Sequence, residues 1–174
     1  MSAFIVSISR GSLRVPRSHG FNRFFAWEVM VVLFLLNVDS WFRNPLAWYQ
    51  LISWLLLVVC FLPLIFGVRS LIAQGKPAEK RETEPQLLGF ESTTVLVTTG
   101  IYHYIRHPLY SSLVFLAWGI FFKIPSVGGS ALVLLATALL IATAKADEAE
   151  CIRFFGPAYE EYRKHTKMFV PFVL

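Results

Sequence analysis

The chain has 174 residues, of which 56% are hydrophobic and 16% are charged, and its net charge is +5. Soluble domains carry charges on about a quarter of their residues, so this composition indicates a membrane protein and makes an ordinary soluble enzyme a poor fit. The length allows one domain. Two cysteines, Cys60 and Cys151, are too few and too far apart to indicate a disulfide framework.

The first half of the chain contains two apolar runs. Residues 1–23 are a basic arm, and the runs Phe24–Phe42 and Ala47–Val68 follow it. The second run is the clearest membrane span, because a helix needs about 20 apolar residues to cross a bilayer. Pro63 within it predicts a kink. A polar loop at residues 73–86 separates these runs from the rest of the chain.

The second half contains two shorter apolar runs. The β-branched segment Thr93–Thr99 is expected to be extended. The run Leu109–Phe122 follows Pro108, a residue that is favoured in the first turn of a helix, and Ser130–Ala144 is expected to pair with this run as a hairpin. From Asp147 the chain is polar, and it is expected to form a cytoplasmic helix.

The expected fold is therefore all-α: an integral membrane domain with about four transmembrane helices and a cytoplasmic C-terminal amphipathic helix. Lys and Arg occur four, one, five, one and five times in the segments before, between and after the runs. Positive charge accumulates on the cytoplasmic side of membrane proteins, so this alternation predicts that both termini and the central loop are cytoplasmic. The topology explains the basic residues, and nucleic-acid binding is not expected.

An unusual polar cluster, "YHYIRHPLYSS" (residues 102–112), lies at the mouth of the third run. Arg106 and His107 can share a helix face with Tyr110. The simpler explanation is an arginine at a positive boundary and tyrosines in an aromatic belt. A His-Pro pair directly at a helix start is less routine, because a helix N-terminus presents N–H groups that favour an anion.

A second cluster, formed by Asp147, Glu148 and Glu150, lies where the fourth run ends. These acids would suit the first turn of a following helix, or they could bind a cationic ligand. The four histidines are scattered, so no metal site is predicted. Aromatic residues follow at helical spacing, which indicates packing or a helix on the membrane surface; they are Phe154, Phe155, Tyr159 and Tyr162.

These motifs together resemble the integral-membrane methyltransferases of the isoprenylcysteine carboxyl methyltransferase family, which are related to phospholipid N-methyltransferases. The resemblance rests on "GIYHYIRHPLY" (residues 100–110), a hydrophobic hairpin, Asp147-Glu148, "FGPAYEEY" (residues 155–162) and Pro171. It covers about residues 95–172. It divides the single domain, residues 1–174, into the basic arm 1–23, the first two spans with their loop at 24–94, and a catalytic half at 95–174.

The resemblance implies S-adenosylmethionine as the methyl donor and a lipophilic acceptor that enters from the bilayer. It implies catalytic roles for Arg106 and Glu148, with Arg106 orienting the acceptor or holding the carboxylates of the site. It places Tyr159 and Tyr162 on the acceptor, capping the pocket. The residues that it places on the cofactor are Tyr102, His107, Pro108, Tyr110 and Glu148.

Two departures from the family pattern leave the acceptor open. The acid pair is Asp147-Glu148 where the family often has two glutamates, and Thr143 and Lys145 stand where carboxyl-methylating members tend to carry an arginine. Carboxyl O-methylation, phospholipid amine methylation and small-thiol methylation all remain, as do a nicotinamide-dependent lipid reductase and a non-catalytic membrane protein. A bacterial inner membrane is the expected location, or the endoplasmic reticulum in a eukaryote.

Overall fold

The computed structural model describes residues 19–75 and 93–171, and these ranges contain helices and no β-strand. The all-α prediction is therefore confirmed for this part of the chain, while residues 1–18 of the predicted arm and 76–86 of the predicted loop lie outside it. The elements are α2 (His19–Asn37), η2 (Val38–Ser40), α3 (Trp48–Val59), α4 (Phe61–Gln74), η3 (Gly100–His103), α5 (Pro108–Phe121), α6 (Val127–Phe155) and α7 (Pro157–His165).

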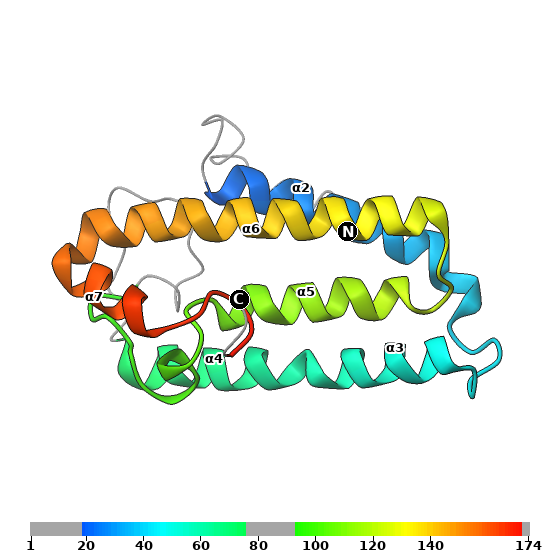
Figure 1. Ribbon diagram of the computed structural model, residues 1–174, viewed down its shortest axis with the longest axis horizontal. Helices are drawn as coiled ribbons and strands as arrows, with labels where there is room; N and C mark the ends of the chain where they lie inside the picture. The colour runs from blue at the N-terminus through cyan, green and yellow to red at the C-terminus, as the bar shows by residue number, and fades with distance from the viewer. Residues whose placement is uncertain (1–18, 76–92, 172–174) are drawn as a thin grey trace.

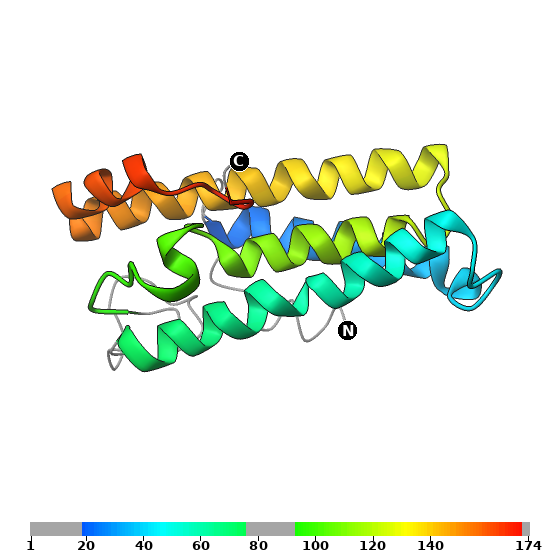
Figure 2. The same ribbon diagram turned by 60° about the horizontal axis from the view of Figure 1, so that its bottom comes forward.

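The long helices run along a common direction, and α5 is the central one (Figures 1 and 2). It contacts α2, α3, α4 and α6. The expected pairing of the last two runs is confirmed by the contact between α5 and α6, but α6 packs most extensively along α2. In Figure 1, η3 and α7 lie at the same end of the bundle, where α4 ends and α5 begins.

The second apolar run forms two helices in line, as its proline predicts. The break lies at Cys60, between α3 and α4, and Pro63 stands in the first turn of α4. Because Pro63 has no N–H to donate to the carbonyl four residues earlier and its ring crowds that carbonyl, the helix deviates there. Together the two pieces extend over Trp48–Gln74, a 27-residue apolar unit.

Among the described residues, three helical units are long and apolar enough to cross a membrane: Gly20–Ser40, Trp48–Gln74 and Val127–Phe155. The fourth, α5, has 14 residues. At 1.5 Å per residue it is about 21 Å long, shorter than a hydrocarbon core of about 30 Å. Helices α2, α3, α4 and α6 contact α5. Length and composition support three of the four predicted spans, and α5 is shorter than a span requires.

Two boundaries predicted from the sequence were wrong. The first helix begins at His19, so residues 19–23 belong to α2 rather than to the arm. The fourth run, predicted as Ser130–Ala144, is the middle of a 29-residue helix that continues to Phe155. The acids therefore lie within the last third of α6 and not in the first turn of a separate helix, which corrects the simpler explanation of their presence.

Apolar side chains cover the outside of the bundle, and polar side chains occur in its interior. Leu36 and Val58 are 63% and 65% exposed, whereas Gln50, Ser53 and Thr143 are fully buried. The buried groups are satisfied locally or by a neighbouring helix: Ser53 Oγ donates to the Gly119 carbonyl at 2.7 Å. This arrangement suits a lipid environment. Apolar side chains can face the lipid there, whereas polar groups must form their hydrogen bonds within the protein.

A buried lysine links the helix connections at the end of the bundle opposite α7. Lys123 is 0% exposed, and its Nζ lies 3.3 Å from the centroid of the Trp54 ring and 3.2 Å from Gln50 Oε1. Gln50 Nε2 in turn donates to the carbonyls of Lys123 and Ser40, at 3.0 and 2.9 Å. Cation–π attraction and hydrogen bonds thus tie the α2–α3 and α5–α6 connections together.

Candidate active site

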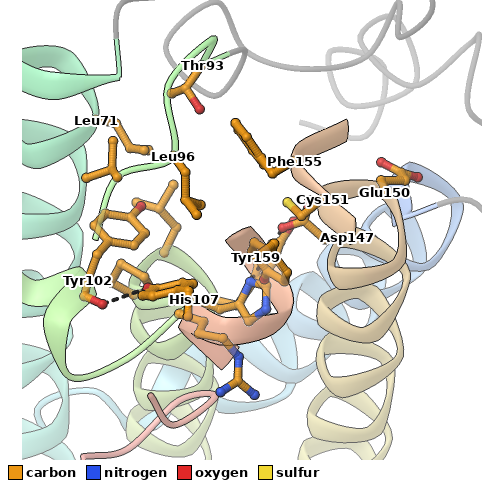
Figure 3. Close-up of a pocket in the computed structure, with 16 residues that line it drawn as sticks. Leu71, Thr93, Leu96, Tyr102, His107, Asp147, Glu150, Cys151, Phe155 and Tyr159 are labelled. Atoms are coloured by element: carbon orange, nitrogen blue, oxygen red, sulfur yellow. Dashed lines mark hydrogen bonds and ion pairs between the residues drawn. The ribbon is translucent and has the colours of Figure 1, made fainter. Parts of the chain in front are cut away.

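A cavity lies at the end of the bundle where the start of α5, the last third of α6 and α7 meet (Figure 3). Leu71 and Leu96 face it from one side, and Asp147, Cys151 and Phe155 face it from α6. Its polar and aromatic lining includes Tyr102, Arg106, His107, Tyr110, Asp147, Glu150, Tyr159 and Tyr162. Segments far apart in the sequence therefore build one partly apolar, partly charged wall.

The start of α5 is fixed by proline and by a close helix approach. Pro108 occupies the first helical position and is fully buried, where its missing N–H costs nothing. Gly67 of α4 lies against it: a Cβ at Gly67 would stand 3.0 Å from Pro108 Cγ. The glycine thus lets α4 and α5 meet closely beneath the cavity, and the contact sets the position of His107.

The C-terminal segment pairs with the residues that precede α5. The Lys167 N–H donates to the Tyr104 carbonyl at 3.0 Å, and the Lys167 carbonyl accepts from the Arg106 N–H at 2.8 Å. The His107 N–H donates to the Met168 carbonyl at 3.1 Å. These bonds form a short parallel pairing that holds Arg106 and His107 on a fixed backbone rather than on a loose loop.

Glu148 is the centre of a buried charge network. Its Oε1 accepts from Arg106 Nε at 2.8 Å and lies 3.4 Å from His107 Nε2, and its Oε2 lies 3.7 Å from Arg163 Nη1. Arg106 also donates through Nη1 to the carbonyls of Arg163 and Thr166 at the end of α7. The network connects α5, α6 and α7, and an unpaired carboxylate left in its place would be costly.

His107 lies between two carboxylates. Its Nδ1 is 3.5 Å from Asp147 Oδ2, and its Nε2, although 3.4 Å from Glu148, has no partner with hydrogen-bond geometry among the described residues. Burial alone would lower the pKa of His107, but the carboxylates of Asp147 and Glu148 beside its two nitrogens outweigh burial and raise the pKa. His107 therefore gains a proton more readily than a solvent-exposed histidine.

Two tyrosines of α7 close the cavity. Tyr159 is buried, and Tyr162 donates its hydroxyl proton to the Tyr102 carbonyl at 2.6 Å. Burial raises the pKa of both phenols, so they remain neutral. The chain reaches α7 through Gly156, whose φ of +59° is a conformation that glycine adopts readily and other residues rarely do.

The site residues predicted from the sequence lie near one another, but they do not all line this cavity. Tyr102, Arg106, His107, Tyr110, Tyr159 and Tyr162 line it, whereas Glu148 pairs with Arg106 and His107 and is not part of the lining. Pro108 also lines it, while it positions the backbone. Further lining residues of this cavity belong to no motif identified in the sequence; they include Leu71, Val97 and Cys151. Arg163 and Thr166, which the sequence did not single out, instead contact Glu148 and Arg106.

Comparison with known proteins points to membrane enzymes. Residues 83–157 match the family model described as phospholipid methyltransferase. The chain is also 28% identical over 127 residues to Delta(14)-sterol reductase of Mus musculus, with 67% of this chain and 30% of that protein covered. The chain thus spans less than a third of the length of this relative. No solved structure matches.

The family match covers η3, α5 and α6, and it ends before Tyr159 and Tyr162. It supports the broader resemblance to membrane methyltransferases and gives no support to isoprenylcysteine specificity in particular. Both comparisons concern proteins that act on lipids or sterols by their printed names. The residues matched by the family model contain the first two clusters identified in the sequence.

Proposed function

We propose that this protein transfers a methyl group from S-adenosylmethionine to a lipophilic acceptor at the membrane boundary. The observation that carries the proposal is the convergence of His107 and Asp147 with four tyrosines around one cavity, with Glu148 packed against His107. The phospholipid methyltransferase match over residues 83–157 supports it. The helices next to the cavity are apolar enough to lie in a membrane, so an acceptor with acyl or prenyl chains can reach it.

The cavity fits the methyl donor chemically. The donor carries a sulfonium and an ammonium group, and aromatic faces attract such cations by about 0.5–2 kcal/mol. Tyr102, Tyr110 and Phe155 supply aromatic surface, while Asp147 and Glu150 supply carboxylates. The donor also carries a carboxylate, for which a protonated His107 in the cavity lining supplies positive charge. Leu71 and Leu96 offer apolar contact for its adenosyl part.

When bound, S-adenosylmethionine supplies an activated methyl group, so the protein needs no covalent nucleophile. Its residues orient and enclose the two reactants. Glu148 and Arg106 hold His107 in place, and Tyr159 and Tyr162 of α7 shield the cavity from water. Fixed alignment of two reactants can lower a barrier by roughly 7–11 kcal/mol at best. In this proposal Arg106 is a positioning residue, because its guanidinium bonds are directed to Glu148 and to α7 carbonyls.

A phospholipid amine is the acceptor that we favour, on the strength of the family match. Asp147 and Glu150 line the cavity and could accept the proton that an amine loses on methylation. The family match gives no support to the isoprenylcysteine carboxylate expected from the sequence. Lys145, which stands near the position of the arginine in carboxyl-methylating members, lies outside this cavity. Labelled methyl transfer into phosphatidylethanolamine, a farnesyl-cysteine analogue and small thiols distinguishes the acceptors.

Ligand stabilisation of the purified full chain in detergent tests the donor assignment. S-Adenosylhomocysteine should raise the melting temperature through binding to the native state, and NADPH should not. The substitution His107→Ala should abolish the shift, whereas His103→Ala, at an exposed histidine of η3, should preserve it. Stabilisation by NADPH alone, or an unchanged shift in the His107 variant, would show that the cavity has been misassigned.

A reductase that acts on a lipid or sterol is the second candidate function. The similarity to Delta(14)-sterol reductase favours it, and so does a group of cations on the far side of Glu148, since a nicotinamide dinucleotide carries phosphates. The comparison covers only part of that relative, so we place this function second. The NADPH arm of the stabilisation experiment tests it directly.

We further propose that the cavity end of the bundle faces the cytoplasm, in a bacterial inner membrane or in the endoplasmic reticulum of a eukaryote. The two connections at the opposite end contain one cation each, Arg43 and Lys123, whereas the cavity end carries Arg69, Lys145, Arg153 and Arg163 among others. Positive charge favours the cytoplasmic side. Protease or thiol-reagent access from one side of sealed vesicles checks this orientation.

A further inference from the structure

A second cavity lies on the opposite side of Glu148 from the first, between α6, α7 and the C-terminal segment. Ile141 and Met168 form its apolar side. Arg106 lines both cavities, so its pair with Glu148 forms a shared wall. The charged lining of the second cavity is strongly unequal, with five cations and one carboxylate: Arg106, Lys145, Arg163, Lys164, Lys167 and Glu148.

The single carboxylate of this cavity is already engaged. Glu148 pairs with Arg106 at 2.8 Å and lies 3.7 Å from Arg163. Lys164 pairs with Glu161 at 2.7 Å, outside the cavity lining. Neither Lys145 nor Lys167 has an ion-pair partner within residues 19–75 and 93–171. The cavity therefore keeps positive charge that no described side chain neutralises.

The two unpaired lysines project from fixed backbone. Lys145 stands one turn before Glu148 on α6, so the two share a helix face. Lys167 is held at both its N–H and its carbonyl by the pairing with residues 104 and 106. Little backbone ordering is required for both to contact one ligand, which reduces the entropic cost of binding.

The two cavities differ in charge because consecutive residues of α6 face different sides. Asp147 lines the first cavity and Glu148 the second, as expected from a rotation of about 100° per residue. The first cavity is aromatic and contains Asp147 and Glu150, which suits a cation. Membrane topology explains why lysines lie at this end of the molecule. It does not explain why lysines of α6, α7 and the C-terminal segment line the same cavity.

We propose that the second cavity is an anion site that binds a phosphate group, with Lys145 and Lys167 as its principal ligands. Phosphate oxygens accept strong charge-assisted hydrogen bonds from such groups. The phosphate could belong to a lipid headgroup, with Ile141 and Met168 beside its apolar part, or to a soluble nucleotide. The site itself does not depend on the methyl-transfer function; only the role of a bound phospholipid as acceptor rests on it.

Calorimetric titration of the full chain in uncharged detergent tests the site with four probes: dihexanoyl phosphatidic acid, dihexanoylglycerol, inorganic phosphate and NADPH. The variant Lys145→Gln/Lys167→Gln is compared with the charge-matched control Arg69→Gln/Arg153→Gln, whose arginines are exposed and line neither cavity. Two exposed charge contacts together are worth about a tenfold change in affinity.

We expect phosphatidic acid to bind, dihexanoylglycerol not to bind, the lysine variant to lose about tenfold in affinity and the control to behave as the native chain. Binding of inorganic phosphate or NADPH with the same dependence on the two lysines upholds the site and identifies a soluble source. No binding of any phosphate-bearing probe, equal binding by the lysine variant, or an equal loss in the control would overturn it. The same variants should still bind S-adenosylhomocysteine; failure of the native chain to do so would refute the methyl-donor proposal while leaving the anion site intact.

Discussion

His107 shows at the residue scale how burial and charge compete. The imidazole is almost fully buried, which disfavours its charged form, yet two carboxylates approach its two nitrogens at 3.5 and 3.4 Å. The carboxylates prevail and the pKa is raised. A proton on His107 therefore stabilises the fold and increases positive charge where the carboxylate of the methyl donor would bind.

The raised pKa of His107 predicts a pH-dependent contribution to stability. Because the folded-state pKa exceeds the unfolded value of about 6.5, the contribution is complete below that value and is lost as pH rises through the raised pKa. The melting temperature of the native chain should therefore exceed that of His107→Gln by more at pH 6 than at pH 9.

Thermal unfolding in detergent at both pH values measures this difference. His103→Gln is the control, because His103 is exposed and its removal should leave the pH profile of the native chain unchanged. A difference that is constant or grows with pH would show that His107 is neutral in the folded protein.

At the scale of elements, the turn between α6 and α7 determines whether the cavity is closed. Gly156 has a φ of +59°, and a Cβ placed there would meet nothing within 4 Å. The requirement for glycine is thus one of backbone conformation and not of space. Pro157 then begins α7 and directs Tyr159 toward the cavity.

Gly156→Ala should destabilise the protein by about 1–3 kcal/mol, because a φ of 59° with a ψ of −137° is a backbone conformation that residues with a Cβ rarely adopt. Gly128→Ala is a matched control, since it also meets open space but stands in the first turn of α6, where alanine is favoured by up to about 1 kcal/mol. Chemical denaturation of the two variants compares them. Equal effects would show that the conformation of Gly156 imposes no strain on alanine.

The limits of sequence reasoning are clearest among these elements. The start of α5 was predicted within one residue because a local rule about Pro108 determines it. The end of α6 was missed because Lys145, Asp147 and Glu148 resemble a polar tail, whereas they face two cavities from one continuous helix. The pairing of Lys167 with residues 104 and 106 joins segments about 60 residues apart, and no local pattern encodes such a contact.

At the scale of the whole molecule, the two ends of the bundle differ in composition and role. Charged residues and tyrosines line the cavity at one end. At the other end, Lys123 contacts Trp54 and Gln50 and stabilises the packing of the helices. The composition and the positions of the apolar runs were enough to predict a helical membrane bundle. The burial of Lys123 was not predictable, since a lysine between two spans is ordinarily a solvated boundary residue.

Lys123→Gln should lower stability by about 1–3 kcal/mol, because the cation–π contact is lost and Gln50 loses its donor. It should leave the affinity for S-adenosylhomocysteine unchanged, since the cavity is at the other end. Thermal unfolding and ligand titration on the same sample measure both quantities. A large fall in affinity with little change in stability would contradict this separation.

Protection of Cys151 from alkylation is the most direct test of the proposed donor cavity. Cys151 lines that cavity, whereas Cys60 is buried between α3 and α4 and serves as an internal control. In the native full chain, S-adenosylhomocysteine should slow maleimide labelling of Cys151 and leave Cys60 unaffected, and NADPH should protect neither. Labelling of Cys151 at the same rate with and without saturating S-adenosylhomocysteine would contradict the assignment of this cavity to the methyl donor.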